Sequence, residues 1–282
     1  MDVKTIAVIG AGTMGRGIAY AAVAGSFRTV LTDVGEEILA QAQGYIRETL
    51  LGAREHGRWS GDPEAALAAL TLTPRLEEAA AAELVIEAVP EVIRQKLEIF
   101  ARLDTLVSPE AILASNTSSL SLTEISAAVS RPERFLGMHF FNPVPKMKLI
   151  ELVYTPATSQ HTLQTAAAVA RQMGKETVRV KDSPGFATSR FNALIGNEAF
   201  RMLEEGVASA EDIDKAVKLG LNHPMGPFEM VDVGLDVRLA ILEYLHKTLG
   251  ERFQPSARMV ELVQAGRLGR KTGRGVYDYG NG

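Results

Sequence analysis

Residues 5–15, TIAVIGAGTMG, decide the fold of this chain, because an apolar run passes directly into a glycine-rich turn. The run TIAVI is short and rich in β-branched residues, which is typical of a parallel strand buried on both faces. The turn has the spacing G-x-G-x-x-G, and the alanine-rich residues 16–24 that follow predict a helix. An ordinary glycine-rich turn could have this spacing, but its position between a strand and a helix favours a dinucleotide-binding site.

Each glycine of this turn has a physical task in such a site. Gly10 allows the tight turn, Gly12 lets a pyrophosphate approach the backbone, and Gly15 lets the helix pack closely against the strand. The N-terminus of the helix also offers free N–H groups to the phosphates. We therefore predict that the whole turn binds the cofactor: Gly10, Ala11, Gly12, Thr13, Met14 and Gly15.

An acidic residue ends the next predicted strand. Residues 29–32, TVLT, form this strand, and Asp33 follows it. A carboxylate here would accept hydrogen bonds from the adenine-ribose hydroxyls and would repel a 2′-phosphate, so NAD is expected rather than NADP. The alternative is that Asp33 caps the N-terminus of the following helix.

Strand-like and helix-like segments alternate through most of the chain. The further predicted strands are residues 84–86, 111–114, 135–141, 149–153 and 177–180. The predicted helices among them are residues 36–55, 64–70, 92–106 and 164–172. Strands that alternate with helices form β-α-β units, so the predicted fold class is α/β, with a Rossmann-type, mostly parallel sheet.

Polar residues directly after a strand of such a sheet are placed for chemistry, because ligands bind outside the carboxyl ends of the strands. Asn116 and Ser118 follow the predicted strand 111–114 in this way. The alternative is that they belong to a loop that caps the next helix.

A histidine and a glutamate are the candidates for acid–base catalysis. His139 lies near the end of the predicted strand 135–141, and Glu151 lies in the apolar run 149–153, which could pair beside it. Hydride transfer from an alcohol needs a base for the hydroxyl proton, and an imidazole titrates near neutrality. A neighbouring carboxylate would fix its tautomer and stabilise the imidazolium. The alternatives are a histidine that packs in the core and a glutamate that lies solvated at a strand edge.

The strand signals stop at the turn KDSPG, residues 181–185. We therefore predict a cofactor-binding domain over residues 1–183 and an all-helical domain over residues 184–282. Residues 266–275 of the second domain, GRLGRKTGRG, are rich in cations. They form either a solvated tail or a segment that closes over phosphates or the cofactor.

Composition excludes several other classes of function. The 282 residues are 46% hydrophobic and 23% charged, with a net charge of −4 and scattered basic residues, so a globular protein without a nucleic-acid partner is expected. An N-terminus that enters a strand at once predicts no signal peptide, and no apolar run is long enough to predict a membrane span or a membrane partner. The absence of cysteine excludes disulfides and thiol catalysis and fits a reducing compartment. No metal-binding spacing occurs, so no metal is expected.

Six motifs occur in one order along the chain: GAGTMG, SNTSSL, HFFNPVP, DSPGF, HPMGPFE and RKTGRGVY. With these motifs the whole chain resembles the 3-hydroxyacyl-CoA dehydrogenases, in particular the short bacterial 3-hydroxybutyryl-CoA dehydrogenases. The resemblance implies NAD-dependent, reversible oxidation of (S)-3-hydroxyacyl-CoA to 3-ketoacyl-CoA, a step of fatty-acid β-oxidation. It also implies a cytoplasmic homodimer that forms through the helical domain.

The resemblance also assigns roles to individual residues. His139 and Glu151 fall on the catalytic pair, and Ser118 on the serine that binds the substrate hydroxyl. Asn142 falls on an asparagine beside the reaction and the cofactor. The remaining cofactor-side positions fall on Glu91, Lys96 and Lys271. We also expect Asn116 and Ser118 to contact the cofactor, because they follow a strand of the sheet.

Two places depart from the family pattern. Ser189 stands in PGFATSR where many members have asparagine, so a hydroxyl of shorter reach would meet the substrate. Thr49 and His56 occupy the positions of a hydroxyl and a lysine that contact CoA, and Arg54 or Arg58 could replace the charge of that lysine.

Two other functions stay open from the sequence. A related sugar-acid dehydrogenase of the gulonate type would keep Ser118, His139 and Glu151 and would need no CoA contacts. A non-catalytic NAD-binding protein is the alternative from another class, and the intact catalytic residues argue against it.

Overall fold

The computed structural model describes residues 2–280. The chain divides into two compact units between Asp182 and Ser183. The division lies one residue before the predicted boundary, within the same turn.

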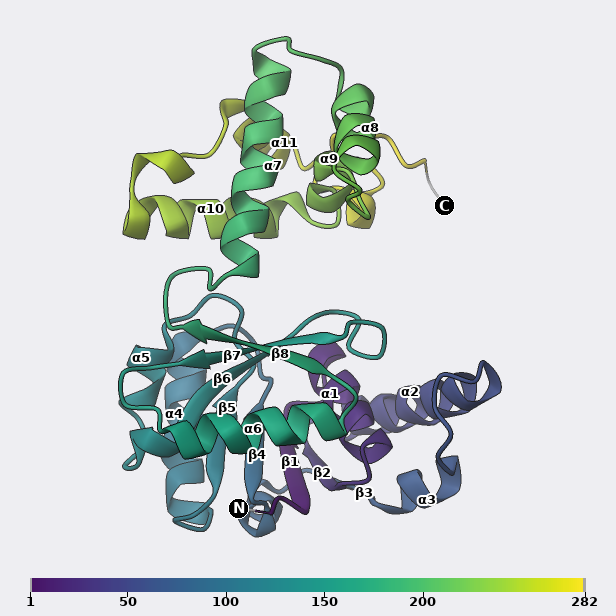
Figure 1. Cartoon of the computed structure of the whole chain (residues 1–282), viewed down its shortest axis with the longest axis vertical. Helices are drawn as coiled ribbons and strands as arrows, with labels where there is room; N and C mark the ends of the chain where they lie inside the picture. Colours follow the sequence, from purple (N-terminus) through teal and green to yellow (C-terminus); the bar gives the residue numbers. More distant parts are fainter. Residues whose placement is uncertain (1, 281–282) are drawn as a thin grey trace. The chain divides into compact units, whose positions relative to one another are not determined.

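The first unit is built on one eight-stranded sheet with the order β3-β2-β1-β4-β5-β6-β7-β8 (Figure 1). The strands are β1 (Thr5–Ile9), β2 (Arg28–Thr32), β3 (Leu70–Thr73), β4 (Leu84–Glu87), β5 (Ile112–Ser115), β6 (Phe135–Phe140), β7 (Leu149–Tyr154) and β8 (Glu176–Lys181). Every neighbouring pair except β6 and β7 is parallel. The predicted mostly parallel sheet is therefore confirmed, with β1 buried along its whole length.

The antiparallel pair β6–β7 decides where the catalytic candidates lie. Only residues 141–148 connect the two strands, which is too short for the crossover that a parallel pair requires. In the resulting register His139 lies directly opposite Glu151. Residues directly opposite each other in an antiparallel pair share one face of the sheet, so the turn between these strands brings the two side chains together.

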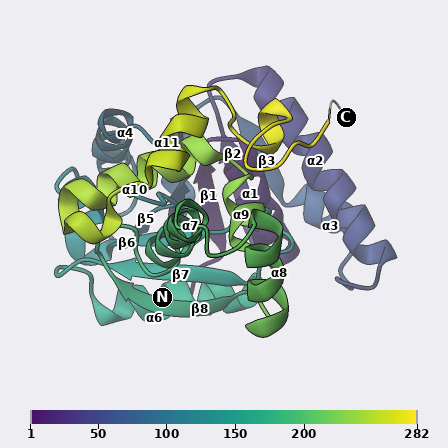
Figure 2. The same ribbon diagram turned by 90° about the horizontal axis from the view of Figure 1, so that it is seen from above.

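Helices cover both faces of this sheet. They are α1 (Thr13–Ala24), α2 (Glu36–Glu55), α3 (Pro63–Ala68), α4 (Ile93–Leu106), α5 (Leu122–Ser126) and α6 (Gln160–Gln172). The unit β1–α1–β2 steps along the sheet in one direction and β4–α4–β5 in the other, so right-handed crossovers place α1 and α4 on opposite faces. Helix α6 shares one buried core with α1, and Figure 2 shows α4 and α6 on either side of the sheet.

One strand was missed in the sequence. A helix was predicted over residues 64–70, but α3 ends at Ala68 and β3 begins at Leu70. Strand β3 is a short edge strand that is only partly buried, and its four residues, LTLT, carry too weak a pattern to separate it from the helix before it. Its pairing with β2, in which Leu70 lies opposite Thr29, is what makes these residues extended.

The second unit is helical, as predicted. Its helices are α7 (Thr188–Glu204), α8 (Ala210–Gly220), α9 (Pro227–Val231), α10 (Leu235–Leu249) and α11 (Ala257–Gln264). Among the residues described up to position 280, its only β pairings are isolated bridges of Arg274 with Gly269 and Asp278. Phe200 of α7 packs edge-to-face on Phe228 of α9 in the core of this unit.

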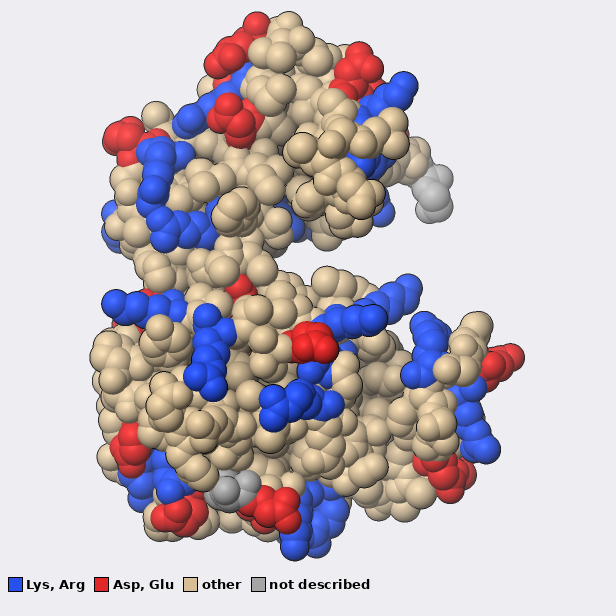
Figure 3. Space-filling view, in the orientation of Figure 1, with Lys and Arg blue, Asp and Glu red and all other residues tan. Residues whose placement is uncertain are grey.

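No described helix is long and apolar enough to span a bilayer. On the face drawn in Figure 3, basic and acidic side chains lie interspersed on each unit rather than gathered in one basic patch. This face therefore lacks the basic stripe that nucleic-acid-binding surfaces carry.

Candidate active site

The glycine-rich turn between β1 and α1 has the backbone that a dinucleotide requires. Gly10 has a φ of +100°, and a Cβ there would lie 2.8 Å from the carbonyl oxygen of Ala88. A Cβ at Gly15 would collide with the carbonyl oxygen of Gly10, so helix and strand can pack this closely only without a side chain. At Gly12, by contrast, a Cβ would meet no atom within 4 Å, so the space beside it is open to a ligand. The turn therefore fits the pyrophosphate of NAD.

Asp33 lies at the carboxyl end of β2 and reaches this turn. Its carboxylate accepts hydrogen bonds from the backbone N–H of Ala11, at 2.8 Å, and of Gly35, at 3.1 Å. The N-cap of α2 is Gly35, so the alternative in which Asp33 caps that helix is wrong. A carboxylate held beside the glycine-rich turn is in the right place to receive ribose hydroxyls.

His139 and Glu151 form a buried pair on β6 and β7. The Nδ1 atom of His139 lies 2.7 Å from Oε2 of Glu151, and both side chains are almost fully enclosed. The alternative of a solvated strand-edge glutamate is therefore wrong. Nδ1 of the imidazole therefore faces this carboxylate, and Nε2 is the other nitrogen of the ring. The ring of Phe141 lies 4.5 Å from the imidazole, between ring centroids.

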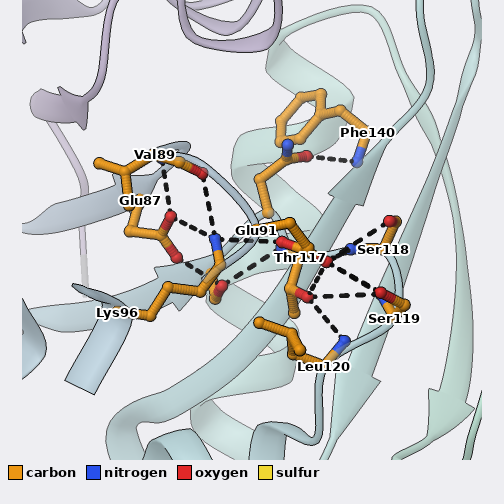
Figure 4. A network of polar contacts seen from close by, with 11 residues as sticks. Glu87, Val89, Glu91, Lys96, Thr117, Ser118, Ser119, Leu120 and Phe140 are labelled. Atoms are coloured by element: carbon orange, nitrogen blue, oxygen red, sulfur yellow. Dashed lines mark hydrogen bonds and ion pairs between the residues drawn. The ribbon is translucent and has the colours of Figure 1, made fainter. Parts of the chain in front are cut away.

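Glu91 ties the loop after β4 to the loop after β5 (Figure 4). Its Oε1 atom accepts hydrogen bonds from the Thr117 hydroxyl, at 2.5 Å, and from the backbone N–H of Ser118 and Ser119, at 2.9 and 3.2 Å. Burial raises the pKa of Glu91, but the nearby Lys96 and these hydrogen bonds outweigh it, so the pKa lies below its ordinary value. Ser118 donates to this Oε1 atom from its backbone N–H and, at 3.5 Å, from its hydroxyl. It does not cap α5, because the N-cap of that helix is Ser121.

Lys96, on α4, is enclosed beneath this loop. Its ammonium contacts Oε1 of Glu87 at 2.6 Å, the carbonyl oxygen of Val89 at 3.3 Å and Oε2 of Glu91 at 3.3 Å. Glu87 was not singled out in the sequence as a functional residue. Its signal was present, because Glu87 is an acidic residue at the carboxyl end of a predicted strand, four positions before Glu91.

Asn116 joins the carboxyl ends of β5 and β6. Its Oδ1 atom accepts a hydrogen bond from the backbone N–H of Phe140 at 2.9 Å, next to His139. Asn142 follows two residues later, exposed, with a cis peptide bond to Pro143. The glycine-rich turn, Asp33 and the site residues predicted at or after the carboxyl ends of β4, β5 and β6 thus all lie in the first unit.

The predicted CoA contacts lie elsewhere on this unit, on α2. The hydroxyl of Thr49 donates to the carbonyl of Tyr45 at 2.6 Å, and the ring of His56 contacts the carbonyl of Gly52 at 2.7 Å. Helix α2 packs on α1, α3 and β3. Arg54, one candidate to replace a CoA-binding lysine, lies 3.9 Å from the carboxylate of Asp62.

Two predicted residues belong to the second unit. Ser189 lies half-buried in the first turn of α7, and Lys271 forms an ion pair with both carboxylate oxygens of Asp236 at 2.6 Å. The hydrogen bond from Lys271 lowers the pKa of Asp236. The cationic segment that contains Lys271 is followed by Val276, whose backbone N–H donates at 2.8 Å to the buried Asp232, so this segment is not a loose tail.

Both units match one family of enzymes. Residues 5–183 match the NAD-binding domain of 3-hydroxyacyl-CoA dehydrogenases, and residues 185–279 match the C-terminal domain of the same family. A probable 3-hydroxybutyryl-CoA dehydrogenase of Bacillus subtilis is 44% identical over 99% of this chain and 98% of its own length.

Solved structures agree with this assignment. An (S)-3-hydroxybutyryl-CoA dehydrogenase of Ralstonia eutropha superposes with a TM-score of 0.96 at 40% identity, covering 99% of this chain and all of that one. A diketoreductase that acts on dicarbonyl compounds superposes with a TM-score of 0.86 at 27% identity, with 99% and 100% coverage. The chain therefore belongs to the 3-hydroxyacyl-CoA dehydrogenase family, and it is an NAD-dependent oxidoreductase.

Proposed function

We propose that this chain catalyses the reversible oxidation of (S)-3-hydroxyacyl-CoA, with 3-hydroxybutyryl-CoA as the preferred substrate, to 3-ketoacyl-CoA. The buried pair of His139 and Glu151 carries this proposal. A histidine at the carboxyl end of a strand, with one ring nitrogen fixed by a carboxylate, is the arrangement that removes a proton from an alcohol as hydride leaves.

NAD would lie along the carboxyl ends of the strands. Asp33 would hold the adenine ribose after β2, and the turn from Gly10 to Gly15 would hold the phosphates after β1. Because β4 and β5 lie on the other side of β1, the nicotinamide half would extend toward Glu91, Asn116 and Lys96. NAD supplies the acceptor for the hydride.

The protein's own residues would carry the proton. Ser118 and Nε2 of His139 would bind the 3-hydroxyl, and Nε2 would take its proton. Glu151 would stabilise the imidazolium that forms, because its carboxylate lies 2.7 Å from Nδ1. Asn142, next to the same strand end, would orient the reacting carbon against the cofactor. In the reverse direction the protonated His139 would act as the acid.

The remaining assignments rest on the family resemblance. Thr49 and His56 would contact CoA from α2, Ser189 would contact the substrate from α7, and Lys271 would contribute to the cofactor site. We also propose that residues 1–183 and 184–282 act as a cofactor domain and a substrate and dimerisation domain, in a cytoplasmic homodimer. The names of the bacterial relatives support the acyl-CoA substrate.

The test is NADH oxidation by the purified protein with acetoacetyl-CoA, compared with free acetoacetate and with NADPH. Fast turnover that requires both NADH and the CoA thioester is expected. Equal or faster turnover of free acetoacetate or of sugar acids would favour a dehydrogenase that needs no CoA, such as the sugar-acid type. The diketoreductase, which acts on dicarbonyl compounds, is one neighbour of this fold whose name includes no CoA ester. NADH binding without turnover of any substrate would favour a non-catalytic protein.

Replacement of Asp33 tests the cofactor assignment separately. Asp33→Ala removes the carboxylate that would repel a 2′-phosphate, so the preference for NADH over NADPH is expected to fall by about tenfold or more. The ratio of kcat/KM for the two cofactors measures it. Equal use of NADPH by the unmodified protein would contradict this role of Asp33.

A further inference from the structure

Glu87 is a buried carboxylate that the proposed reaction does not use. It is the last residue of β4 and is 0% exposed. Its Oε1 atom accepts hydrogen bonds from Lys96, at 2.6 Å, and from the backbone N–H of Val89, at 2.8 Å, and its Oε2 atom accepts one from the Ser115 hydroxyl at 2.6 Å. Both oxygens thus face donors, which is the environment of an ionised carboxylate.

Lys96 lies between Glu87 and a second carboxylate, that of Glu91. Its ammonium has three hydrogens, and the structure supplies three acceptors: these two carboxylates and the carbonyl of Val89. The Lys96 side chain is only 1% exposed, so these three acceptors enclose its ammonium. Two carboxylates therefore share one ammonium, and the cluster of Glu87, Lys96 and Glu91 carries a net charge of about −1.

The place of this charge matters because the two forms of the cofactor differ in charge. The cluster lies at the carboxyl ends of β4 and β5, on the side of β1 opposite β2 and Asp33. A dinucleotide whose adenine ribose lies at Asp33 extends its nicotinamide half toward this side. The nicotinamide ring is positively charged in NAD⁺ and neutral in NADH, so a fixed negative charge nearby attracts only the oxidised ring.

We propose that Glu87 supplies a buried negative charge that raises the affinity of this site for NAD⁺ relative to its affinity for NADH, as one member of the charged cluster with Lys96 and Glu91. Glu87 touches neither the substrate nor the reacting atoms in this scheme. It sets the electrostatic field there and holds Lys96 and Glu91 in place. The inference rests on NAD binding, which the family shows, and not on the acyl-CoA substrate.

The experiment compares the dissociation constants of NAD⁺ and NADH, measured by titration calorimetry without substrate. Glu87→Gln keeps the size of the side chain and removes one charge. The ratio of the NAD⁺ constant to the NADH constant is expected to rise by about three- to tenfold, because only the charged ring loses attraction. This ratio distinguishes an electrostatic role of Glu87 from a merely structural one, because a structural defect would weaken the binding of NAD⁺ and NADH equally.

Two matched variants control for packing and for total charge. Ser115→Ala removes the hydroxyl that donates a hydrogen bond to Glu87 but keeps the charge of Glu87. The ratio of dissociation constants is therefore expected to stay unchanged. Glu98→Gln removes an exposed carboxylate of α4, which pairs with Arg94, and is also expected to leave the ratio unchanged. A shift in Ser115→Ala as large as that in Glu87→Gln would overturn the proposal.

An unchanged ratio in a folded Glu87→Gln protein, judged by circular dichroism, would also overturn it. If that variant does not fold, Glu91→Gln removes the same unit of charge from the cluster, and an unchanged ratio there decides against the proposal. Acetoacetyl-CoA reduction is a separate measurement. A failed substrate assignment would therefore leave the ratio intact, and an unchanged ratio would leave the substrate assignment intact.

Discussion

Two glutamates of the same sheet, Glu151 and Glu87, are both completely buried, and they differ in the cation that faces them. Glu151 on β7 pairs with His139 at 2.7 Å, whereas Glu87 on β4 pairs with Lys96 at 2.6 Å. An imidazole gains and loses a proton near neutral pH, whereas an ammonium keeps its proton there. In the proposed reaction the first pair would therefore exchange a proton with a substrate, whereas the second would keep its two opposite charges.

The surroundings of the two pairs follow this difference. The ammonium of Lys96 has three hydrogen-bond acceptors around it, and the carboxylate of Glu87 has three donors. The protein itself therefore satisfies the hydrogen bonding of both groups. His139 lies at the end of β6 beside the loop that begins at Phe141. In the two proposals, similar burial of a carboxylate would thus serve two different purposes, and the partner residue would decide which.

The largest effect is expected when the histidine of the first pair is replaced. His139→Gln removes the base, so kcat should fall by about two to four decades. Stopped-flow or steady-state turnover with acetoacetyl-CoA and NADH measures it. His161→Gln, an exposed histidine on α6, is the matched control and should leave turnover unchanged. Unchanged turnover in His139→Gln would break the comparison, because this pair would then be structural too.

Removal of the lysine from the second pair should mainly affect stability. Lys96→Met leaves Glu87 buried without its cation, which typically costs about 3–5 kcal/mol of the free energy of unfolding. Urea denaturation measures this change. Arg94→Met on the same helix removes only an exposed ion pair with Glu98, which should cost about 1 kcal/mol or less. Equal losses of unfolding free energy in the two variants would show that the buried pair of Lys96 and Glu87 stabilises the protein no more than the exposed pair of Arg94 and Glu98.

A smaller change in turnover is expected from the carboxylate of the first pair. Glu151→Gln keeps a hydrogen-bond acceptor for Nδ1 but removes the charge that stabilises the imidazolium, so kcat should fall by roughly one to two decades. The affinity for NAD should stay nearly intact, as calorimetry would show. Glu176→Gln on β8, an exposed carboxylate, serves as the control. Parallel losses of turnover and NAD affinity would mean that Glu151 is structural.

The smallest effect concerns Glu91, the half-exposed carboxylate that shares Lys96 with Glu87. Although burial raises its pKa, Lys96 and the hydrogen bonds from Thr117 and Ser118 bring the pKa below 4.5. The stabilisation by ionised Glu91 is therefore complete at a pH above the pKa of this residue in the unfolded chain. It is lost as the pH falls through its lower pKa in the folded protein. The difference in unfolding free energy between wild type and Glu91→Gln should be at most about 1 kcal/mol at neutral pH and should shrink below that pKa. A difference that stays constant as the pH falls well below the unfolded pKa would contradict this prediction.

Local patterns in the sequence were enough for much of the fold and for the candidate residues. The glycine spacing from Gly10 to Gly15 implies its own backbone geometry, because a Cβ at Gly10 or Gly15 meets neighbouring carbonyls. The prediction of a helix from residue 36 to about residue 55 is confirmed by α2, whose buried residues recur at helical spacing. Strand β3 was missed, because its extended form depends on pairing with β2 rather than on its own four residues.

The sequence by itself determined the α/β class, the dinucleotide-binding turn, the helical second unit and the identity of His139 and Glu151 as candidates. Periodicity, turn residues and motif order are properties of neighbouring positions, and they need no knowledge of distant contacts. Only the tertiary structure decided that His139 faces Glu151 in register and that Glu87 and Glu91 share Lys96. The sequence indicates that the strands of His139 and Glu151 could pair, but their register, the order of the strands and the position of α4 on the sheet depend on contacts between distant residues.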